Sequence, residues 1–306
     1  MLSITSTTPQ IFANRLSSPA HLYNSVAFAE LNRFKCDDND IRYLLLGDKK
    51  VRGGIILGLH GDTLHSPFSA PFGGLLTNRN QYIELIDEMW SNIIAYAEKQ
   101  GLHLRITLPP LFYDPAITAK SISSLHRLGL KAVIDLNFHL CPQTAPLDFA
   151  SSFKNRLCQA VAAGAQVNPI EPTATNIERV YRLVEANHYA KNRPVRMSLD
   201  NVIATAKIAD ADFFLLSHEG CDIAGAMTYH VAKDIIQVIY WGDAPGHSAI
   251  RPMNMLASGI IEHYKRQEIK IIDFGPSTED GEPNTGLCSF KEDFGCIPTP
   301  KYTFTL

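Results

Sequence analysis

Residues 213–230 contain two apolar runs separated by a polar turn. The first run, Phe213–His218, reads Phe-Phe-Leu-Leu-Ser-His, and the second, Ile223–His230, reads Ile-Ala-Gly-Ala-Met-Thr-Tyr-His. The turn between them, Glu219–Asp222, contains a glycine. Short apolar runs on both sides of such a turn are typical of neighbouring strands in a buried sheet. The stretch therefore predicts a buried β-hairpin.

A similar pattern occurs near the start of the chain. Tyr43–Asp48 is followed by a polar turn at Lys49 and Lys50, and then by the apolar run Gly53–His60. In both places a glycine lies near the start of the second run. We interpret the two stretches as a weak internal repeat, and the alternative is a coincidence that any α/β chain can produce.

The segments after the two hairpins also correspond. Asn80–Gln100 carries apolar residues at helical spacing, and His103–Leu108 predicts a strand that ends at two prolines. In the second half, Met253–Tyr264 has a similar helical stripe, and Ile269–Phe274 predicts the strand that follows it. The order strand, strand, strand, helix, strand thus occurs twice, which indicates two α/β domains of one plan.

Between the repeats we expect a linker and three further helices. The linker Cys141–Leu147 contains two prolines, and Phe149–Val161 has large apolar residues every four positions. A capping box at Thr175 and Glu178 predicts the start of a second helix, and Ser198 predicts the start of a third. We therefore predict an N-terminal domain over residues 1–143 and a C-terminal domain over residues 144–306.

Composition restricts the class of protein. The 306 residues are 45% apolar and 19% charged, and the formal net charge is -3, so no strong positive field is present to hold duplex DNA. The first ten residues lack the basic and apolar pattern of a secretory signal, and the longest apolar runs are too short to cross a bilayer. Six cysteines without a C-x-x-C pair indicate reduced thiols. We expect a cytoplasmic protein with no transmembrane segment and no DNA partner.

Several catalytic signatures are absent from the sequence. It contains no P-loop, no G-x-G-x-x-G after a strand, no H-E-x-x-H and no G-x-S-x-G. His60 and His65 are better explained as parts of a strand and its turn than as metal ligands. These absences disfavour metal hydrolases and serine hydrolases, and we expect no metal site.

The C-terminal region carries the most specific motif. Asp273-Phe-Gly-Pro-Ser-Thr is followed by a glycine-rich stretch and then by Phe290-Lys-Glu-Asp-Phe-Gly295. This F-K-x-x-F-G pattern closely resembles the Fem family of peptidyltransferases, and in the first half the loop Ser66–Gly74 (Ser-Pro-Phe-Ser-Ala-Pro-Phe-Gly-Gly) supports the resemblance. The resemblance implies two tandem acetyltransferase-like (GNAT) domains. It also implies transfer of an amino acid from aminoacyl-tRNA to a peptidoglycan precursor in bacterial cell-wall biogenesis.

The resemblance assigns a role to Lys291. In the family, the lysine of this motif is thought to stabilise charge near the reacting carbonyl or to bind a substrate phosphate. General chemistry supports the first of these roles without the resemblance. Aminolysis of an ester or thioester passes through an oxyanion, which a fixed ammonium stabilises. The alternative is that Lys291 only forms a salt bridge with Glu292 or Asp293.

A GNAT fold also implies a groove between its fourth and fifth strands. Here Gln237–Trp241 and Ile269–Phe274 would form that groove, with Tyr240, Asp273 and Ser277 as the candidates that point toward it. Asp273 would accept a proton from the attacking ammonium, which must lose one before it can react. The alternative for Asp273 is a cap for the loop that follows.

The acyl donor is less clearly indicated. Coenzyme-A-using GNAT enzymes usually carry R/Q-x-x-G-x-G/A at the start of the helix after the fourth strand. Here the segment 243–252 matches only at Gly246, and Asp243 brings the wrong charge. This favours an aminoacyl-tRNA donor, although His247 and Arg251 could hold a phosphate in another way.

A basic cluster in the middle of the chain offers a surface for tRNA phosphate or a phosphorylated precursor, with Tyr181 and Tyr189 interleaved. The alternative is an ordinary solvated helix face. The chain also lacks the long helical arm of some Fem proteins, which weakens the case for tRNA. The basic residues are Arg179, Arg182, His188, Lys191, Arg193 and Arg196.

The function we predict is N-acyl or aminoacyl transfer to an amine of a small-molecule or lipid-linked cell-surface precursor. The second domain would carry the catalytic groove, and the first would help to hold the acceptor at a cleft between the domains. Aminoacyl-tRNA or acyl-CoA would act as co-substrate, with no tightly bound cofactor. The alternatives are an acyl-CoA-dependent N-acyltransferase and a non-catalytic binding module. The catalytic candidates are Lys291, Asp273 and Tyr240, and the substrate-binding candidates are Ser66, Phe68, Ser69, Phe72, Arg105, Tyr189, Arg193, His247, Arg251, Ser277 and Phe290.

Overall fold

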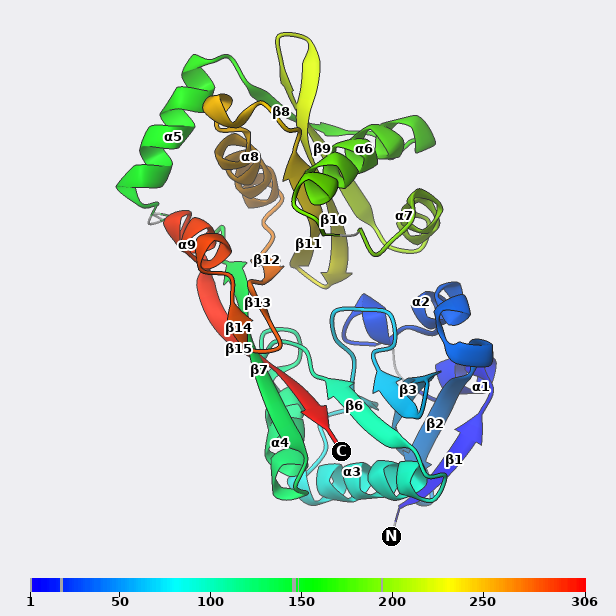
Figure 1. Cartoon of the computed structure of the whole chain (residues 1–306). Coiled ribbons are helices and arrows are strands. Elements are labelled where there is room, and N and C mark those ends of the chain that lie inside the picture. The colour runs from blue at the N-terminus through cyan, green and yellow to red at the C-terminus, as the bar shows by residue number, and fades with distance from the viewer. Residues whose placement is uncertain (1, 17–18, 145–146, 148, 194) are drawn as a thin grey trace. The chain divides into compact units, whose positions relative to one another are not determined.

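The computed structural model describes residues 2–16, 19–144, 147, 149–193 and 195–306. It is a mixed α/β structure in which mostly antiparallel strands are flanked by helices (Figure 1). The chain forms two compact units. The first unit comprises Met1–Leu136, Thr278–Glu282 and Thr299–Leu306, and the second comprises Asn137–Ser277 and Pro283–Pro298. Three strands, β7 (Lys131–Leu140), β14 (Glu282–Pro283) and β15 (Ile297–Thr305), contribute residues to both units.

In the first unit the strands follow the order β1-β2-β3-β4-β6-β15. Neighbours are antiparallel except β4 and β6, which run parallel. The apolar face of the sheet is covered by α3, whose Met89, Trp90 and Ile93 are fully buried. The bounds are β1 (Ser3–Thr7), β2 (Ile41–Gly47), β3 (Val51–His60), β4 (Thr63–Ser66), β5 (Leu76–Thr77, paired with β3) and β6 (His103–Thr107).

Three helices of the first unit begin at polar caps. Thr8 caps α1, Ser25 caps α2 and Asp114 caps α4, each by accepting a hydrogen bond from the backbone N–H three residues later. The bounds are α1 (Pro9–Arg15), α2 (Val26–Leu31), α3 (Ile83–Glu98) and α4 (Pro115–Arg127), with short 3-10 turns at Leu22–Asn24, Arg33–Lys35 and Asp37–Asn39.

In the second unit the strands follow the order β7-β12-β11-β10-β9-β8. Again one neighbouring pair, β11 with β12, is parallel and the others are antiparallel. Helix α8 covers one face with its buried Leu256, Ile260 and Tyr264. The bounds are α5 (Ser151–Ala162), β8 (Gln166–Ile170), α6 (Ala174–Ala190), α7 (Leu199–Ala206), β9 (Ala211–His218), β10 (Cys221–Ala232), β11 (Ile235–Asp243), α8 (Pro252–Arg266), β12 (Ile271–Pro276) and α9 (Thr285–Asp293), with a 3-10 turn at Ser248–Ile250. A further short strand, β13 (Thr278–Glu279), belongs to the first unit and pairs with β14.

The predicted repeat is present. Both hairpins form, β2 with β3 and β9 with β10, and each is followed by a further strand, a long helix and a parallel strand. Ser198 caps α7 as predicted, with its hydroxyl accepting from Asn201 N. The predicted cap at Thr175 is wrong, because Thr173 caps α6 and Thr175 lies inside the helix.

The predicted domain boundary at 143/144 stays a prediction. The compact units assign Thr278–Glu282 and Thr299–Leu306 to the first unit, although these residues lie late in the chain. Residues 145 and 146 of the predicted linker lie outside the described residues.

Candidate functional site

The parallel strands β11 and β12 pair over a short distance only. Their register comprises Ile235 with Ile271, Ile236 with Ile272, and Gln237 with Asp273, and beyond the last pair they no longer pair. Each strand is irregular at this point. Ile239 is an extra residue in β11 opposite β10, and Phe274 is an extra residue in β12 opposite β7. β-Bulges of this kind bend a strand and often lie beside functional sites. The predicted separation of these two strands is therefore present.

The bulge in β11 changes which side chains share a face. Val238 and Trp241 both pack into the core on the α8 side. Successive side chains of a regular strand point to opposite faces of the sheet, which would place Val238 and Trp241 on different faces. The extra residue Ile239 shifts this alternation by one position, so both lie on the same face. Gln237 and Tyr240 consequently lie together on the other face of the sheet. The pKa of Tyr240 is raised because burial disfavours the phenolate, and its oxygen accepts from Arg196 N at 3.2 Å.

Asp273 lies at the end of the parallel pairing and is fully buried. Its carboxylate accepts hydrogen bonds from Asn137 Nδ2 at 2.7 Å, Gln237 Nε2 at 2.7 Å and Gly275 N at 2.8 Å. Gly275 has φ +74°, a conformation that favours glycine, and it lets the chain turn back to this carboxylate. Three donors around one buried carboxylate hold it in place.

Lys291 extends from α9 to the same turn. Its Nζ donates to the carbonyl oxygens of Gly275 at 2.8 Å and Pro276 at 3.1 Å, and it lies 5.5 Å from the ring centre of Phe138. The side chain is only 1% exposed. Burial lowers the pKa of Lys291 from 10.5 to about 8, against a smaller opposing effect of Cys296 and Asp273. One of the three ammonium N–H groups has no partner among the described residues.

The alternative of a salt bridge from Lys291 to its neighbours is not what the structure shows. Asp293 instead accepts from Ser152 at 2.8 Å and lies 3.4 Å from Arg156. Among the described residues no ion pair joins Lys291 to Glu292 or Asp293. Lys291 is therefore a buried ammonium bound to the backbone carbonyls of the turn.

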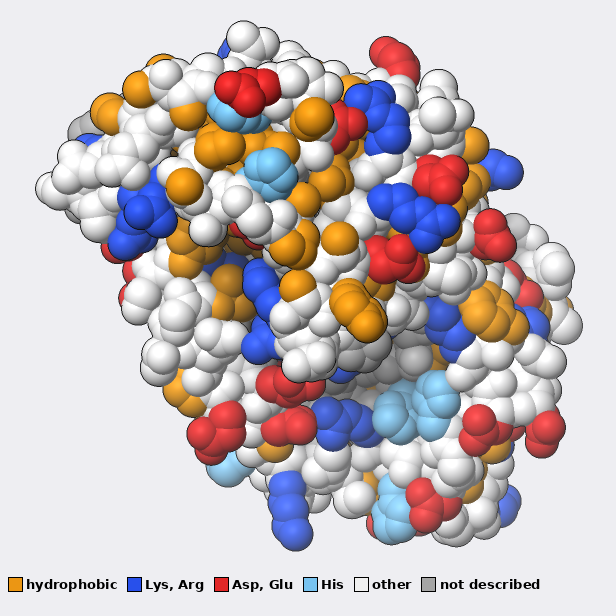
Figure 2. All heavy atoms as spheres, turned by 45° about the horizontal axis from the view of Figure 1, so that its top comes forward, with side chains coloured by type: hydrophobic (Ala, Val, Ile, Leu, Met, Phe, Trp, Pro, Cys, Tyr) orange, Lys and Arg blue, Asp and Glu red, His pale blue; other side chains and the backbone are white. Residues whose placement is uncertain are grey.

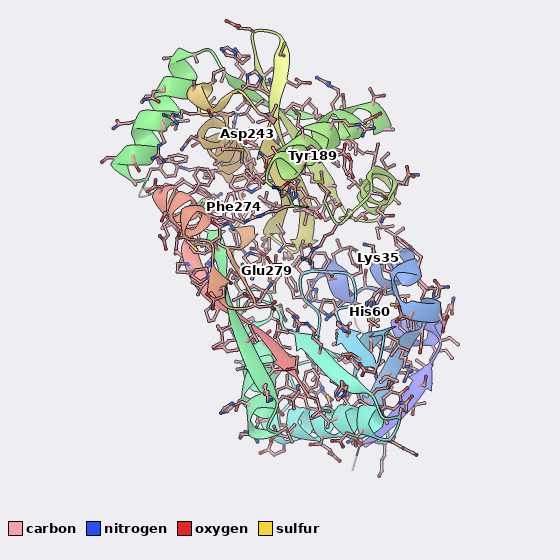
Figure 3. The ribbon with its side chains drawn as sticks, in the orientation of Figure 1. Lys35, His60, Tyr189, Asp243, Phe274 and Glu279 are labelled. Carbon is pink, nitrogen blue, oxygen red and sulfur yellow. The ribbon has the colours of Figure 1, made fainter. Side chains whose placement is uncertain are left out.

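Ser277 and Phe290 complete the surroundings of Lys291. The Ser277 hydroxyl is buried and has no hydrogen-bond partner within the part of the chain that the structure describes. Phe290 packs on Trp241 and Phe294, at 5.8 Å and 5.2 Å between ring centres. Phe274, labelled in Figure 3, joins this aromatic group from β12. The aromatic rings keep the α9 side of the turn apolar.

The segment between β11 and α8 holds the candidates for phosphate binding. Asp243, at the end of β11 (Figure 3), accepts from Asn187 Nδ2 at 2.8 Å through its carboxylate and at 2.9 Å through its backbone oxygen. Arg251 has φ +58° directly before α8, and its Nε donates to Gln159 Oε1 at 3.3 Å. His247 is half-buried on the same segment. No hydrogen bond or ion pair joins His247 and Arg251 among the described residues.

Two arginines of the predicted basic cluster are paired with acids. Arg179 pairs with Asp222 at 2.8 Å, and Arg182 pairs with Glu178 and Glu185. On the face shown in Figure 2, Lys and Arg side chains are interspersed with Asp and Glu. Arg193 is exposed, and Tyr189, labelled on α6 in Figure 3, is 85% exposed. This arrangement favours a solvated helix face at Arg179 and Arg182.

The candidates of the first unit mostly contact other segments of that unit. Phe72 is fully buried, and Phe68 packs against β3, where Gly58 leaves room: a Cβ there would lie 2.5 Å from the Phe68 ring. Ser69 Oγ accepts from Lys35 Nζ at 2.9 Å. Arg105 lies 3.6 Å from Asp280 and is half-exposed.

Ser66 ends the parallel pairing of the first unit, where it lies opposite Ile106 on β6. Its hydroxyl accepts from Gly74 N at 3.0 Å, and Gly73 N donates to Thr107 O at 2.9 Å. The loop Ser66–Gly74 thus folds back and pairs with the β6 backbone just past the last strand pair. In the first unit, the loop Ser66–Gly74 therefore occupies the position beside β6 where the pairing of β4 with β6 ends.

Three further features bear on the function. Within the described ranges, no group of three or more His, Cys, Asp or Glu residues is arranged to hold a metal ion. All six cysteines are free. None of the helices that the structure describes combines the length and apolar character needed to cross a membrane.

Solved structures share this architecture over almost the whole chain. FemX superposes with a TM-score of 0.68 at 12% sequence identity and covers 99% of this chain and 97% of its own. The chain has the fold of FemX. L-PGS from Bacillus licheniformis follows with a TM-score of 0.63 at 12% identity, over 98% of this chain and 92% of that chain. A tandem GNAT protein from the clavulanic acid biosynthesis pathway has a TM-score of 0.54 at 11% identity, and the match covers 100% of this chain and 98% of that chain.

These likenesses confirm the predicted Fem-like, tandem GNAT fold. No protein-family model matches the chain, and no curated protein matches its sequence.

Sequence reasoning did not find every polar group of the site. Gln237 and Asn137 donate to Asp273, and His139 lies opposite Asp273 in the strand register. Burial lowers the pKa of His139, while the charge of Asp273 opposes that effect. The signal available was a polar residue within an apolar strand, as at Gln237, because such a residue needs a buried partner. Asn137 and His139 gave no such signal, because their strand β7 was not predicted.

Proposed function

We propose that this protein transfers an aminoacyl group from aminoacyl-tRNA to a primary amine of a cell-wall or other cell-surface precursor, in the cytoplasm. The observation that carries the proposal is the buried Lys291 ammonium beneath the point where β11 and β12 separate. A separated parallel pair leaves backbone groups free to bind an extended acyl donor. The Fem-like fold supports the same reaction class.

In the proposed reaction the acceptor amine, after losing a proton, attacks the ester carbonyl of the donor. A C–N bond forms, and the carbonyl oxygen becomes an oxyanion. The carbonyl then re-forms as the C–O bond to the tRNA breaks, and the leaving ribose oxygen takes up the proton that the attacking nitrogen releases, which gives an amide and a free hydroxyl. We assign the third N–H of Lys291 to the oxyanion, where one fixed donor in a water-poor site contributes about 2.7–4 kcal/mol.

The structure supports different roles for the other two catalytic candidates. Asp273 is fully buried and accepts from three donors, so we assign it a positioning role: it fixes the turn whose carbonyls hold Lys291. Tyr240 shares its face with Gln237, and its phenol stays protonated because burial raises its pKa. We propose it as a hydrogen-bond donor to the substrate, together with Ser277, whose hydroxyl has no partner among the described residues.

Thermal unfolding separates the possible donors. Purified protein is heated with aminoacyl-tRNA, deacylated tRNA, acetyl-CoA or free coenzyme A. A ligand at 100 times its Kd adds about 2.7 kcal/mol to the free energy of unfolding, which is readily visible as a rise in melting temperature. A rise with aminoacyl-tRNA that shrinks with salt supports the proposal. A rise with coenzyme A would instead identify an acyl-CoA-dependent N-acyltransferase.

Activity tests then address Lys291 itself. Transfer of a labelled amino acid to peptidoglycan-precursor amines is compared between the wild type, Lys291→Met and the surface control Lys154→Met. Loss of one oxyanion donor lowers kcat by about 10²–10³-fold. Equal activity of wild type and Lys291→Met would remove the ammonium from the mechanism. No transfer and no ligand stabilisation in the wild type would favour a binding module.

A further inference from the structure

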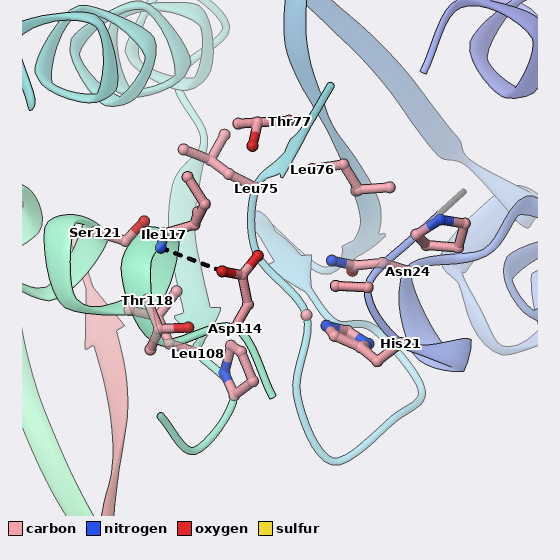
Figure 4. Close-up of a pocket in the computed structure, with 14 residues that line it drawn as sticks. His21, Asn24, Leu75, Leu76, Thr77, Leu108, Asp114, Ile117, Thr118 and Ser121 are labelled. Carbon is pink, nitrogen blue, oxygen red and sulfur yellow. Dashed lines mark hydrogen bonds between the residues drawn. The ribbon is translucent and has the colours of Figure 1, made fainter. Parts of the chain in front are cut away.

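The first unit contains a small cavity of about 110 Å³. Figure 4 shows Thr118 and Ser121 of α4 and its N-cap residue Asp114 lining it, with His21 and Asn24 facing them from the other side. Part of its wall is apolar, formed by Leu75, Leu76, Leu108 and Ile117. All lining residues belong to the first unit, so the cavity is separate from the site proposed for acyl transfer.

Two buried polar atoms of this lining have no partner among the described residues. They are His21 Nδ1 and Ser121 Oγ, on side chains of residues that are 4% and 1% exposed. Burial lowers the pKa of His21 to about 3, so its imidazole is neutral at pH 7. Buried polar atoms in native proteins are almost always hydrogen-bonded, because leaving one unpaired destabilises the fold. Two such atoms on one cavity offer hydrogen-bonding partners to a small polar molecule.

Asp114 supplies a carboxylate to the same cavity. One of its oxygens accepts from Ile117 N at 3.3 Å and caps α4, and no ion pair to this carboxylate is present among the described residues. Burial raises the pKa of Asp114, against smaller opposing effects of the Ile117 N–H and the Lys120 charge. The Lys120 ammonium itself donates to Asn80 Oδ1 and Gln81 O, so a cation placed directly on the carboxylate would stabilise its charged form further.

We propose that this cavity binds a small amino alcohol, with its ammonium group on Asp114 and its hydroxyl on His21 Nδ1 and Ser121 Oγ. The methylene groups between them would contact Leu108 and Ile117. A dry cavity of about 150 Å³ holds benzene, so 110 Å³ suits a molecule of about four or five non-hydrogen atoms. A primary amine is protonated at neutral pH and matches the carboxylate.

The test uses the full chain and three probes of similar size. Ethanolamine carries an ammonium and a hydroxyl, ethylene glycol carries two hydroxyls, and glycolate carries a hydroxyl and a carboxylate. Amide NMR shifts of Ile117 and Thr118 are followed during titration at pH 7 and constant ionic strength. Because so small a ligand binds weakly, we expect a millimolar Kd for ethanolamine and at least about tenfold weaker binding of the other two.

Two variants and two controls locate the binding. Asp114→Asn removes the charge but keeps a good helix cap, and Ser121→Ala removes the hydroxyl from a helix that alanine favours. We expect at least about tenfold weaker ethanolamine binding in Asp114→Asn and about three- to tenfold in Ser121→Ala. Glu84→Gln near the start of α3 and Ser123→Ala on the exposed side of α4 should bind as the wild type does.

Three results would overturn the proposal. Equal binding of ethylene glycol would make the cavity a neutral polar site, and no shift with ethanolamine up to about 100 mM would make it a water-filled one. Unchanged ethanolamine binding in both Asp114→Asn and Ser121→Ala would place the ligand elsewhere. None of these results depends on acyl transfer, so they leave the proposed function untouched.

Discussion

Replacing Lys291 with methionine should change how stability depends on pH. The pKa of this lysine falls from 10.5 to about 8 because the ammonium is buried. At about 1.4 kcal/mol per pH unit, the buried charge lowers the free energy of unfolding by about 3 kcal/mol at neutral pH. Between pH 8 and pH 10.5 the unfolded chain keeps the proton that the folded chain has released. The wild type therefore gains stability as pH rises through this window, and Lys291→Met lacks that gain.

The pH dependence is a better measure than the stability at one pH. Methionine removes the buried charge, but it also leaves the carbonyls of Gly275 and Pro276 without their donor, which costs about 1–3 kcal/mol. That second effect does not change with pH. Between pH 7 and pH 9.5 we expect the free energy of unfolding of the wild type to rise by about 2 kcal/mol relative to the variant.

Tryptophan fluorescence can follow the second unit alone. The chain has two tryptophans, and Trp241 packs beside Phe274 and Phe290 next to the turn. In a Trp90→Phe background, urea unfolding reported by Trp241 gives the free energy at each pH. The control Lys154→Met changes an exposed lysine of α5 and should follow the wild type at every pH. Parallel pH curves for wild type and Lys291→Met would refute a buried ammonium at this position.

Three further predictions concern stability in urea unfolding. His230 Nε2 donates to Asp212 Oδ2 at 3.0 Å, and this contact raises the pKa of His230. The stabilisation is therefore complete below the unfolded pKa near 6.5 and is lost as pH rises through the folded pKa. His230→Gln should therefore lose up to about 1 kcal/mol at pH 5.5 and less at pH 8.5, and an equal loss at both would contradict the ion pair. Because Thr173 caps α6, Thr173→Ala should lower the free energy of unfolding by about 1 kcal/mol, and Thr175→Ala by less than half of that. A larger loss in Thr175→Ala would show that Thr175 is the cap, as the sequence predicted. Gly242→Ala should cost about 1–3 kcal/mol, because its Cβ would lie 2.7 Å from Asn187 Cβ, and a neutral effect would show that α6 can move away.

Much of the fold could be predicted because it is encoded locally. The hairpins β2–β3 and β9–β10 are apolar runs beside turns, and α3 and α8 carry apolar stripes that match their buried residues. The error at Thr175 is also local in origin. Thr173 and Thr175 are both good caps, and the choice depends on where the backbone becomes helical, which the side chains alone do not decide.

The pairing of β15 could not be predicted. Its residues Thr303–Thr305 pair with β6, although nearly two hundred residues separate the two strands in the chain. Strand propensity identifies a strand but not its partner. The hydrogen-bond partners of Asp273 could not be predicted for the same reason, because Asn137 and Gln237 lie on two other strands. The motif located Lys291, and only the structure showed that its partners are carbonyls rather than carboxylates.

The two units use the same strand order but end their parallel pairing with different residues. The last pair is Ser66 with Ile106 in the first unit and Gln237 with Asp273 in the second. Past Ile106, the backbone oxygen of Thr107 already accepts from Gly73, so the chain itself fills the position where strands separate. Past Asp273, the carbonyls turn to Lys291 instead and the strands stay unpaired. A polar last pair, a buried ammonium and open strands occur together in the second unit alone within the described residues. We therefore expect group transfer to depend on the second unit, and substitutions at Ser66 to affect stability rather than the chemical step.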